Sequence, residues 1–415
     1  MYARTLSLYD FKCFGTAKLD LQFPGRDDED ASELANINLI LGDNGGGKSS
    51  VLRGLAIAVL APALLEQGFV PYRLVRRPAA DKGPEVSLLK VTGRPEDGER
   101  PFIKRKTLEL LARIERRDNS SRDRLTLEST PNSPIDKLLS DDFSPAFFVV
   151  GYGATRRVET GEFSDSSARR SRGRRYQRIA SLFEDHVALR PLASWLERLR
   201  GDQRLFDNAV ALIDAVLPPQ IRFSGVFDRE DDQYIFDFDG VPTPFTALSD
   251  GYKAFVGWVG DLIGHLADVS KGAARLEDIA GIVLVDEIDL HLHPAWQREV
   301  VPTLSRVFPK LQFVLTSHSP LVASTVRRQN VFVTETAEDG SATIKQLGEF
   351  VYGRSAEQLL LSSYFGLVST RPAAFHSEAE KLFERVASGE SEAALEYLNR
   401  LTGDDEAHSV GAAKA

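Results

Sequence analysis

The chain has 415 residues, of which 42% are hydrophobic and 27% charged, an ordinary composition for a globular protein with a sizeable core. Its formal net charge of −9 argues against a protein whose whole surface coats nucleic acid, but it leaves room for a local basic patch. The single cysteine, Cys13, excludes an intrachain disulfide. The N-terminus lacks a secretory pattern and no stretch approaches the roughly 18 apolar residues of a membrane span, so we expect a cytoplasmic protein without membrane contact.

The first part of the chain combines strand patterns with one helix. Alternating apolar and polar residues predict antiparallel strands in four segments, which are residues 3–8, 17–23, 86–92 and 101–110. Short apolar runs predict buried strands over 36–41 and 147–153, and a helical period predicts a helix over 49–65. The glycine-rich residues 42–48 are therefore expected at a turn that leads from a strand into a helix.

From residue 156 onwards, a basic segment gives way to alternating strands and helices. Residues 156–178 hold eight arginines against three acidic residues, which predicts a mobile basic loop. Helices are predicted over five segments, which are residues 190–217, 248–269, 295–308, 355–368 and 377–402. Strands are predicted as a hairpin over 221–227 and 233–239, and as buried strands over 281–287 and 312–318. This alternation indicates a parallel sheet in an α/β fold.

The turn before the first helix has the composition of a phosphate-binding loop. Residues Gly42–Ser49 match the pattern G-x-x-x-x-G-K-[ST] between a strand and a helix. Glycines let backbone N–H groups approach a triphosphate, and the positive end of the helix faces the same anion. Lys48 is expected to reach the β- and γ-phosphates, and Ser49 to bind Mg²⁺. The predicted ATP contacts are Gly42, Asp43, Asn44, Gly45, Gly46, Gly47, Lys48, Ser49 and Ser50.

Two later strands end in residues suited to hydrolysis. Asp286 follows the buried strand 281–285 and is predicted to bind Mg²⁺, while the next residue, Glu287, is placed to polarise the attacking water. His318 lies at the end of the buried strand predicted over 312–318. There a neutral imidazole can hydrogen-bond the γ-phosphate or the attacking water. Lys48, Glu287 and His318 are therefore the predicted catalytic residues.

These motifs, in this order, resemble the ABC-type ATPase heads of the SMC and RecF class. The resemblance rests also on LSDGYK (248–253) and on the N-terminal LSLYDFKCFG (6–15), and it covers residues 1–110 and 245–350. It implies a mixed sheet with a parallel core, an antiparallel β-lobe, a helical insertion and a helical C-terminus. In that family the LSxG signature caps the γ-phosphate of ATP on the opposite subunit, which implies this role for Ser249, Asp250 and Gly251. Asp250 replaces the more usual glycine. Two heads would then enclose two ATP molecules, as a pair or within a higher oligomer.

Two further segments narrow the resemblance to a smaller group of ATPases. DEIDLHLHPAWQ (286–297) and GRSAEQLLLSSYFGL (353–367) look like the stand-alone ATPases of bacterial defence systems, in the PtuA-like group linked with Septu and retrons and in OLD-type nucleases. The resemblance implies a D-loop role for Asp289. His291 and His293 could instead form a metal pair, although packing between two heads accounts for them better. The heptads of SMC arms and a nuclease-like cluster are both missing, so we expect an armless head whose nuclease, such as an HNH protein, is a separate chain.

The basic loop leaves two interpretations open. Its arginines can contact the phosphates of DNA or RNA, with Tyr176 stacking on a base, or they can belong to a solvated loop or a docking site for an acidic partner. The candidate nucleic-acid contacts are Arg169, Arg170, Arg172, Arg174 and Arg175.

Three functions compete at this point. The first is a dimerising ATPase that gates a nuclease in anti-phage defence, the second a RecF-type repair ATPase, and the third the nucleotide-binding subunit of a transporter. Asp250 and the basic insertion count against the transporter. The chain is expected to divide into an N-terminal lobe with the P-loop (1–150), an insertion (151–244), a C-terminal lobe with the signature and the acidic pair (245–350), and a helical segment (351–415).

Overall fold

A computed structural model describes residues 1–78, 83–118, 120–127, 134–158, 172–270, 275–337 and 340–402. Two compact units divide the chain, Met1–Ala356 and Glu357–Ala415. The three segments expected within residues 1–350 all fall in the first unit, and the boundaries between them remain a prediction.

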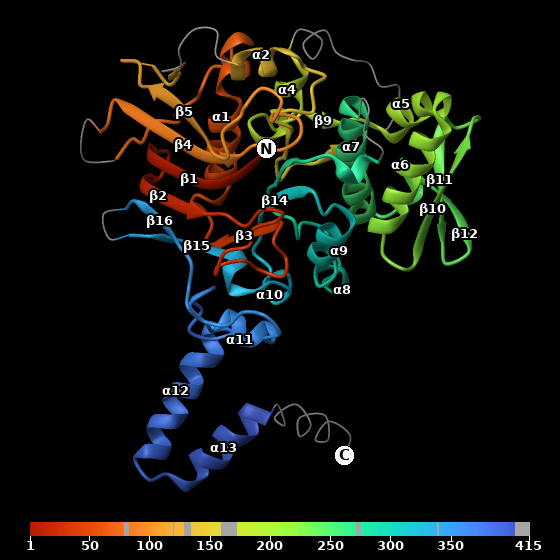
Figure 1. The fold of residues 1–415 in the computed structure, drawn as a ribbon. Coiled ribbons are helices and arrows are strands. Elements are labelled where there is room, and N and C mark those ends of the chain that lie inside the picture. Colours follow the sequence, from red (N-terminus) through yellow and green to blue (C-terminus); the bar gives the residue numbers. More distant parts are fainter. Residues whose placement is uncertain are drawn as a thin grey trace. The chain divides into compact units, whose positions relative to one another are not determined.

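One eleven-stranded sheet runs through the first unit, in the order β6-β5-β4-β1-β2-β16-β15-β3-β14-β13-β7 (Figure 1). In chain order its strands are β1 Tyr2–Phe11, β2 Phe14–Asp20, β3 Ile37–Gly42, β4 Val86–Arg94, β5 Leu108–Glu115, β6 Arg124–Thr126, β7 Val149–Tyr152, β13 Gly281–Val285, β14 Leu311–Thr316, β15 Val331–Thr336 and β16 Ala342–Lys345. Strands β15, β3, β14, β13 and β7 pair in parallel, whereas β6, β5, β4, β1 and β2 pair antiparallel. The sheet therefore has the parallel core and the antiparallel lobe that the sequence predicts.

The two parts of the sheet differ in burial in the way their sequences indicate. All residues of β13 and β14 are buried, as expected for apolar runs covered on both faces. Along β4, buried and half-buried residues alternate, which matches one face on the core and the other nearer to solvent. Apolar patterning thus decided which strands lie at the centre of the unit.

Helix α1 (Lys48–Glu66) follows β3 and packs against β1, β4 and β5. By length and composition it could cross a membrane, so the expectation that no stretch approaches such a span is wrong on that measure. It is, however, 67% buried inside the structure, as is typical of a core helix. The hydrophobic residues of its successive turns fill the space beside the antiparallel strands.

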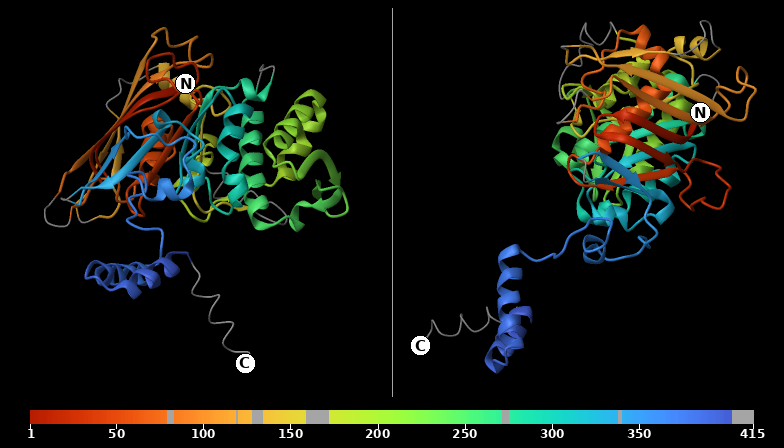
Figure 2. Two further views of the ribbon diagram at one scale, coloured as in Figure 1. Left: turned by 90° about the horizontal axis from the view of Figure 1, so that it is seen from below. Right: turned by 90° about the vertical axis from the view of Figure 1, so that its left-hand side faces the viewer.

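The later part of the insertion, from residue 192 to 244, lies beside α7 and away from the antiparallel strands, as Figure 2 shows from two further sides, whereas its residues 174–177 pack against α1. Its elements, with those that flank it, are α2 Pro134–Ser140, β8 Arg157–Val158, α4 Arg174–Gln177, β9 Ala188–Leu189, α5 Leu192–Leu196, α6 Gln203–Val216, β10 Ile221–Asp228, β11 Gln233–Phe238, β12 Val241–Pro244 and α7 Asp250–Val269. Helix α6 packs against α7 and α9, and β10, β11 and β12 form a small antiparallel sheet. Asp202 caps α6 through a side-chain hydrogen bond from the Leu205 N–H.

The remaining helices are short, apart from two near the C-terminus. They are α8 Pro294–Gln297, α9 Val300–Val307, α10 Pro320–Ala323, α11 Ala356–Leu360, α12 Ala373–Ala387 and α13 Ser391–Thr402. Within the second unit α12 and α13 pack together, with the rings of Phe383 and Tyr397 6.1 Å apart. This pair confirms the predicted helical C-terminus.

Several predicted boundaries are wrong. Residues 101–107 form turns, and the strand begins only at Leu108. The helices expected over 295–308 and 377–402 are each divided in two, and most of 355–368 after α11 is turn or irregular. The sequence pattern predicts no strand at β15 or β16. Their pairing with distant segments completes the sheet. Hydrophobic periodicity locates an element better than it locates its ends.

Candidate functional site

The strand order places the predicted motifs at one edge of the sheet. Strand β3 pairs in parallel with β14, β14 with β13, and β13 with β7. Thr316 aligns with Ile40, and Val285 aligns with both Leu315 and Tyr152. Because parallel strands end at the same edge, the phosphate loop, the acidic pair and the histidine segment meet there, where ligands bind in open α/β sheets.

The phosphate loop needs glycine at specific positions. Gly42, Gly45 and Gly47 have φ angles of 138°, 82° and 95°, which L side chains rarely adopt. At Gly42 a Cβ atom would also lie 2.2 Å from the Thr334 hydroxyl, and at Gly47 it would lie 2.6 Å from the Cys13 sulfur. The loop is thus held between β15 and the turn that joins β1 to β2, whose side chains pack against its glycines.

Lys48 lies folded into this loop. Its ammonium group donates hydrogen bonds to the carbonyl oxygens of Gly42 and Asp43, each at 2.9 Å. Burial lowers the pKa of Lys48, while the carboxylates of Asp286, Glu287, Asp43 and Asp289 act in the opposite direction. A triphosphate in the loop can accept the hydrogen bonds that Lys48 now donates to these two carbonyl groups.

A single hydroxyl group joins the two acidic residues of the site. The Thr316 hydroxyl donates to Asp286 Oδ1 at 2.6 Å and accepts from the Glu287 N–H at 2.7 Å. Thr316 is fully buried and Asp286 is nearly so. Glu287 has a φ of 50°, a strained value for a side chain of this size. The end of β14 therefore orients the carboxylate of Asp286 and the backbone that presents Glu287.

Arg156 is a site residue that the sequence reading missed, because it was assigned to the mobile basic loop. It follows β7, the neighbour of β13, and its guanidinium donates to the carbonyl oxygen of Asp286 at 2.5 Å and to that of Glu287. Burial lowers the pKa of Arg156 to about 10, so the side chain stays charged at neutral pH. Its position four residues after the end of the buried strand β7 was the signal that could have identified it.

The signature segment is positioned by close backbone packing. Ser249 is exposed at the N-cap of α7 and makes no capping hydrogen bond with its side chain, so its hydroxyl is free for a ligand. At Gly251 a Cβ atom would lie 2.3 Å from the His291 carbonyl oxygen, so only glycine fits against the segment after Asp289. Among the residues described, no hydrogen bond or ion pair joins Ser249–Gly251 to the phosphate loop of the same chain.

His318 lies near the acidic pair on an exposed turn. Its backbone N–H approaches Asp289 Oδ1 at 3.4 Å, and its ring is open to solvent. His293 instead caps α8, with Nδ1 accepting from the Ala295 N–H. Over the described part of the chain, no group of three or more metal-binding side chains occurs, so a metal pair at His291 and His293 gains no support.

Of the arginine-rich segment predicted as a mobile loop, only residues 156–158 and 172–178 are described, and this described part is ordered by hydrogen bonds. Arg169 and Arg170 lie outside the described residues, but Arg175 is 1% exposed and donates to five backbone carbonyl oxygens around α2. The prediction that Arg175 contacts nucleic acid is therefore wrong, and the same holds for base stacking on the buried Tyr176. Arg172 pairs with Glu184 and Arg174 with Asp268, so the charge of both is already partly balanced.

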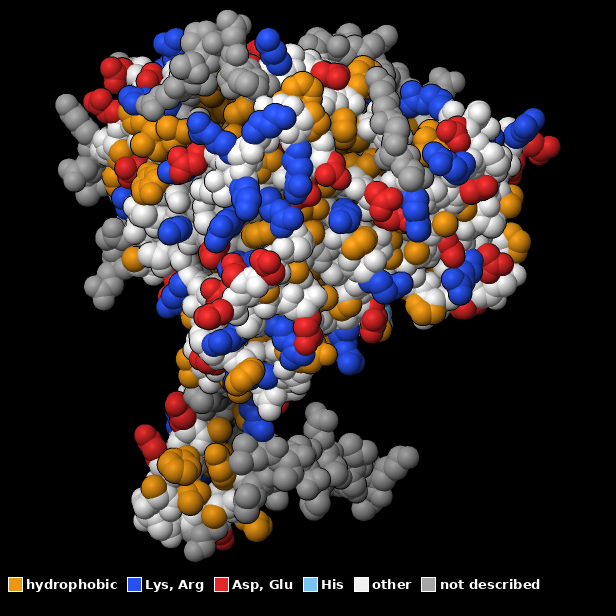
Figure 3. Space-filling view, viewed as in Figure 1, with side chains coloured by type: hydrophobic (Ala, Val, Ile, Leu, Met, Phe, Trp, Pro, Cys, Tyr) orange, Lys and Arg blue, Asp and Glu red, His pale blue; other side chains and the backbone are white. Residues whose placement is uncertain are grey.

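The face of the molecule shown in Figure 3 carries acidic and basic side chains close to one another. Among the described residues on this face, acidic side chains lie between the basic ones, unlike the uniformly basic areas that bind nucleic acid through charge alone. This distribution agrees with the net charge of −9.

Comparison with known proteins assigns the family. The profile of the family described as "AAA domain, putative AbiEii toxin, Type IV TA system" matches residues 37–324. The Septu protein PtuA of Bacillus mycoides is 28% identical over 392 residues, covering 92% of this chain and 47% of that protein. The retron Ec83 probable ATPase of Escherichia coli is 36% identical over 104 residues, covering 25% of this chain and 19% of that protein. The chain thus spans about half the length of the PtuA relative.

Solved structures show the same fold. The SMC head bound to the C-terminal winged-helix domain of ScpA has a TM-score of 0.53 at 16% identity, covering 84% of this chain and 98% of that one. The Pyrococcus furiosus head with an extended coiled coil has a TM-score of 0.50 at 15% identity, covering 83% and 96%. Together with the family match, these relatives confirm the prediction of an ATPase with an SMC-like head. The chain belongs to this AAA-domain family, has the SMC head fold, and is related to the ATPases of the Septu and retron type.

Proposed function

We propose that this chain hydrolyses ATP as one half of a head pair and that its closed state gates a separate effector, a nuclease, in anti-phage defence. The observation that carries the proposal is the shared edge of β3, β14 and β13, where the phosphate loop with Lys48 and the segment with Asp286 and Glu287 both begin. This is the arrangement that holding a triphosphate and directing water against it requires.

The residues of the edge divide the work. The N–H groups of Gly42–Ser49 and the amine of Lys48 hold the phosphates, and Glu287 orients the attacking water with help from His318. Ser49 and Asp286 are the residues suited to Mg²⁺, since a hydroxyl and a carboxylate are oxygen ligands and Asp286 keeps Oδ2 available beside its bond to Thr316. When bound, the ion would neutralise charge on the phosphates.

The head pair is supported by what the single chain lacks. The exposed, uncapped Ser249 and the N-terminus of α7 present a hydroxyl and free N–H groups, without a bond to the phosphate loop of their own chain. An anion bound on a second copy would satisfy these groups. ATP would thereby join two chains, and hydrolysis would release them.

The defence role and the nuclease partner rest on the relatives. PtuA is named a Septu protein, and the retron Ec83 relative is named a probable ATPase. The chain covers only part of each of them, so the activity, partner and trigger of the whole protein are part of this proposal.

The test is Glu287→Gln, which removes the carboxylate charge but preserves the shape of the side chain. The variant should bind ATP with parental affinity, lose at least about 100-fold in kcat, and accumulate as an ATP-bound dimer in size-exclusion chromatography with light scattering. Ser249→Ala is the matched control: it should prevent the dimer while leaving ATP binding to the single chain intact. Parental turnover by Glu287→Gln, or full turnover by a strictly monomeric protein, would contradict the scheme.

A further inference from the structure

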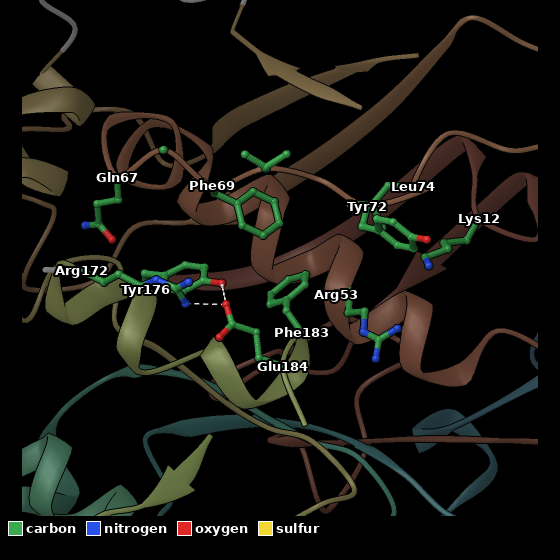
Figure 4. Close-up of a pocket in the computed structure, with 12 residues that line it drawn as sticks. Lys12, Arg53, Gln67, Phe69, Tyr72, Leu74, Arg172, Tyr176, Phe183 and Glu184 are labelled. Carbon is green, nitrogen blue, oxygen red and sulfur yellow. Dashed lines mark hydrogen bonds and ion pairs between the residues drawn. The ribbon is translucent and has the colours of Figure 1, made fainter. Parts of the chain in front are cut away.

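A cavity of about 330 Å³ lies outside the described catalytic edge, between α1, the segment after it, and the turn between β1 and β2. Figure 4 shows Lys12, Arg53 and Tyr72 at one end and Gln67 at the other, with the rings of Phe69 and Phe183 between them. Its volume is near the lower end of the roughly 300–1,000 Å³ range of small-molecule pockets. The cavity can hold one ligand of about the size of a nucleotide.

Two cations at one end lack a counter-ion. Neither Lys12 nor Arg53 forms an ion pair within the described part of the chain, and Arg53 uses only Nε, in a bond to the Leu182 carbonyl oxygen. Burial and the charge of Arg53 both lower the pKa of Lys12, as expected for two like charges in a partly desolvated place. The nearby Asp123 is already bound to Arg77 at 2.7 Å. An anion at this end would relieve the repulsion.

The backbone around this end of the cavity is held in place by hydrogen bonds. Lys12 has a φ of 54°, and its backbone N–H donates to the Leu74 carbonyl oxygen at 2.7 Å. The buried Asp123 accepts from the N–H groups of Leu74 and Val75 at 2.6 and 3.0 Å. The strained turn and the segment that carries Tyr72 are therefore fixed relative to each other, which positions Lys12 before any ligand arrives.

The rest of the cavity offers flat apolar surfaces and one unpaired acceptor. The ring centroids of Phe69 and Phe183 lie 5.2 Å apart, and Tyr72 is 62% exposed at the rim. Gln67 Oε1 is buried and has no hydrogen-bond partner among the described residues. Such an oxygen can accept a hydrogen bond from the exocyclic amine of a base, and flat rings favour stacking with it.

The far end does not attract anions in the same way. Arg172 stacks over Tyr176 at 4.9 Å and pairs with Glu184, which also accepts a 2.6 Å hydrogen bond from the Tyr176 hydroxyl. The positive charge of the cavity is thus concentrated at Lys12 and Arg53. This polarity orients a ligand that has an anionic end and an aromatic end.

We propose that this cavity is a second nucleotide-binding site, with a phosphate at Lys12 and Arg53 and a base against Tyr72 and the two phenylalanine rings. The ligand is either the phosphorylated end of a nucleic-acid strand or a free mononucleotide, which share this chemistry. None of residues 42–49 lines the cavity, although it adjoins the phosphate loop, because Cys13, next to Lys12, packs against Gly47. Its occupancy can therefore be transmitted to the ATP site.

The test uses the full chain with Lys48→Ala, so that binding at the phosphate loop does not contribute. A short, terminally phosphorylated single-stranded DNA with a fluorescent label is titrated by anisotropy over a range of salt concentrations, and AMP is added as a competitor. Adding Lys12→Gln should weaken binding about tenfold and reduce the salt slope by about 0.7, the value for one phosphate contact on a single strand. Adding Tyr72→Ala should weaken it by a similar factor without changing the slope.

The controls separate the outcomes. Lys12 makes no hydrogen bond through its side chain and Tyr72 is largely exposed, so both variants should fold, and Arg222→Gln, at an exposed arginine elsewhere, should bind as the parent does. Displacement by AMP identifies a free nucleotide as a ligand, and binding of DNA alone identifies a strand end. The proposal is overturned if neither probe binds the Lys48→Ala protein, or if Lys12→Gln and Tyr72→Ala bind like the parent. Because Lys48 is replaced throughout, failure of the proposed ATPase cycle cannot produce either result.

Discussion

Thr316 is the residue whose replacement tests the catalytic edge most directly. Thr316→Val keeps the volume of the buried side chain but removes the hydroxyl that bridges Asp286 Oδ1 and the Glu287 N–H. The β-branched shape suits the strand equally well, so β14 should form as before. The change therefore acts on the orientation of the acidic pair and not on the fold.

The size of the effect follows from the two bonds. A hydrogen bond to a charged carboxylate contributes about 1.5–3 kcal/mol, and a buried N–H left unpaired costs about 1–3 kcal/mol. The contributions do not add fully, because the turn at Glu287 can relax, so we expect about 2–4 kcal/mol in total. If this loss falls on the transition state, kcat should decrease by about 30- to 1,000-fold.

Steady-state ATP hydrolysis, together with equilibrium binding of a non-hydrolysable ATP analogue, measures the two effects separately. We expect kcat to fall at least about 30-fold while analogue affinity changes less than about threefold, because the phosphate loop is untouched. Thr316→Ser keeps the hydroxyl and should stay within about threefold of the parental kcat. Parental turnover by Thr316→Val would show that the bridge does not position the reacting groups.

Three further changes test other parts of the structure. Gly251→Ala places a methyl group 2.3 Å from the His291 carbonyl oxygen, so it should destabilise the chain by about 1–3 kcal/mol and reduce dimerisation. Urea unfolding measures the loss of stability and light scattering measures dimerisation. Gly201→Ala, where the added methyl group meets open space, should change neither. Arg156→Met removes two hydrogen bonds to the acidic segment and should lower kcat at least about tenfold with ATP affinity retained, and an unchanged kcat would refute its positioning role. The pKa of His265 is lowered to about 4 by burial and a neighbouring arginine. Because the unfolded histidine protonates near pH 6.5, stability should fall by up to about 3 kcal/mol between about pH 6.5 and 4, and His265→Gln should remove this part of the pH dependence in urea titrations.

Much of the catalytic edge follows from local sequence. The glycines and Lys48 form a contiguous phosphate loop, and Asp286 and His318 each follow a short apolar run whose length is typical of a buried strand. Parallel strands end at one edge, so these motifs could be placed together without coordinates. The family and the mixed sheet, by contrast, were expected from the resemblance of these motifs to the SMC and RecF heads.

Contacts between distant segments could not be predicted in this way. Arg156 and Asp286 are 130 residues apart, and Arg175 was grouped with exposed arginines although it is buried among carbonyl groups of α2 and of the segment after it. The uncompensated pair of Lys12 and Arg53 belongs to two different elements. Whether a charged side chain binds backbone carbonyl groups, is buried in the core or is available to bind an anion depends on its neighbours in the folded structure. The sequence by itself therefore determined which catalytic and phosphate-binding groups the chain carries. Only the tertiary structure decided which polar side chains remain available to bind a ligand, because burial and the pairing of charges depend on residues distant in the sequence.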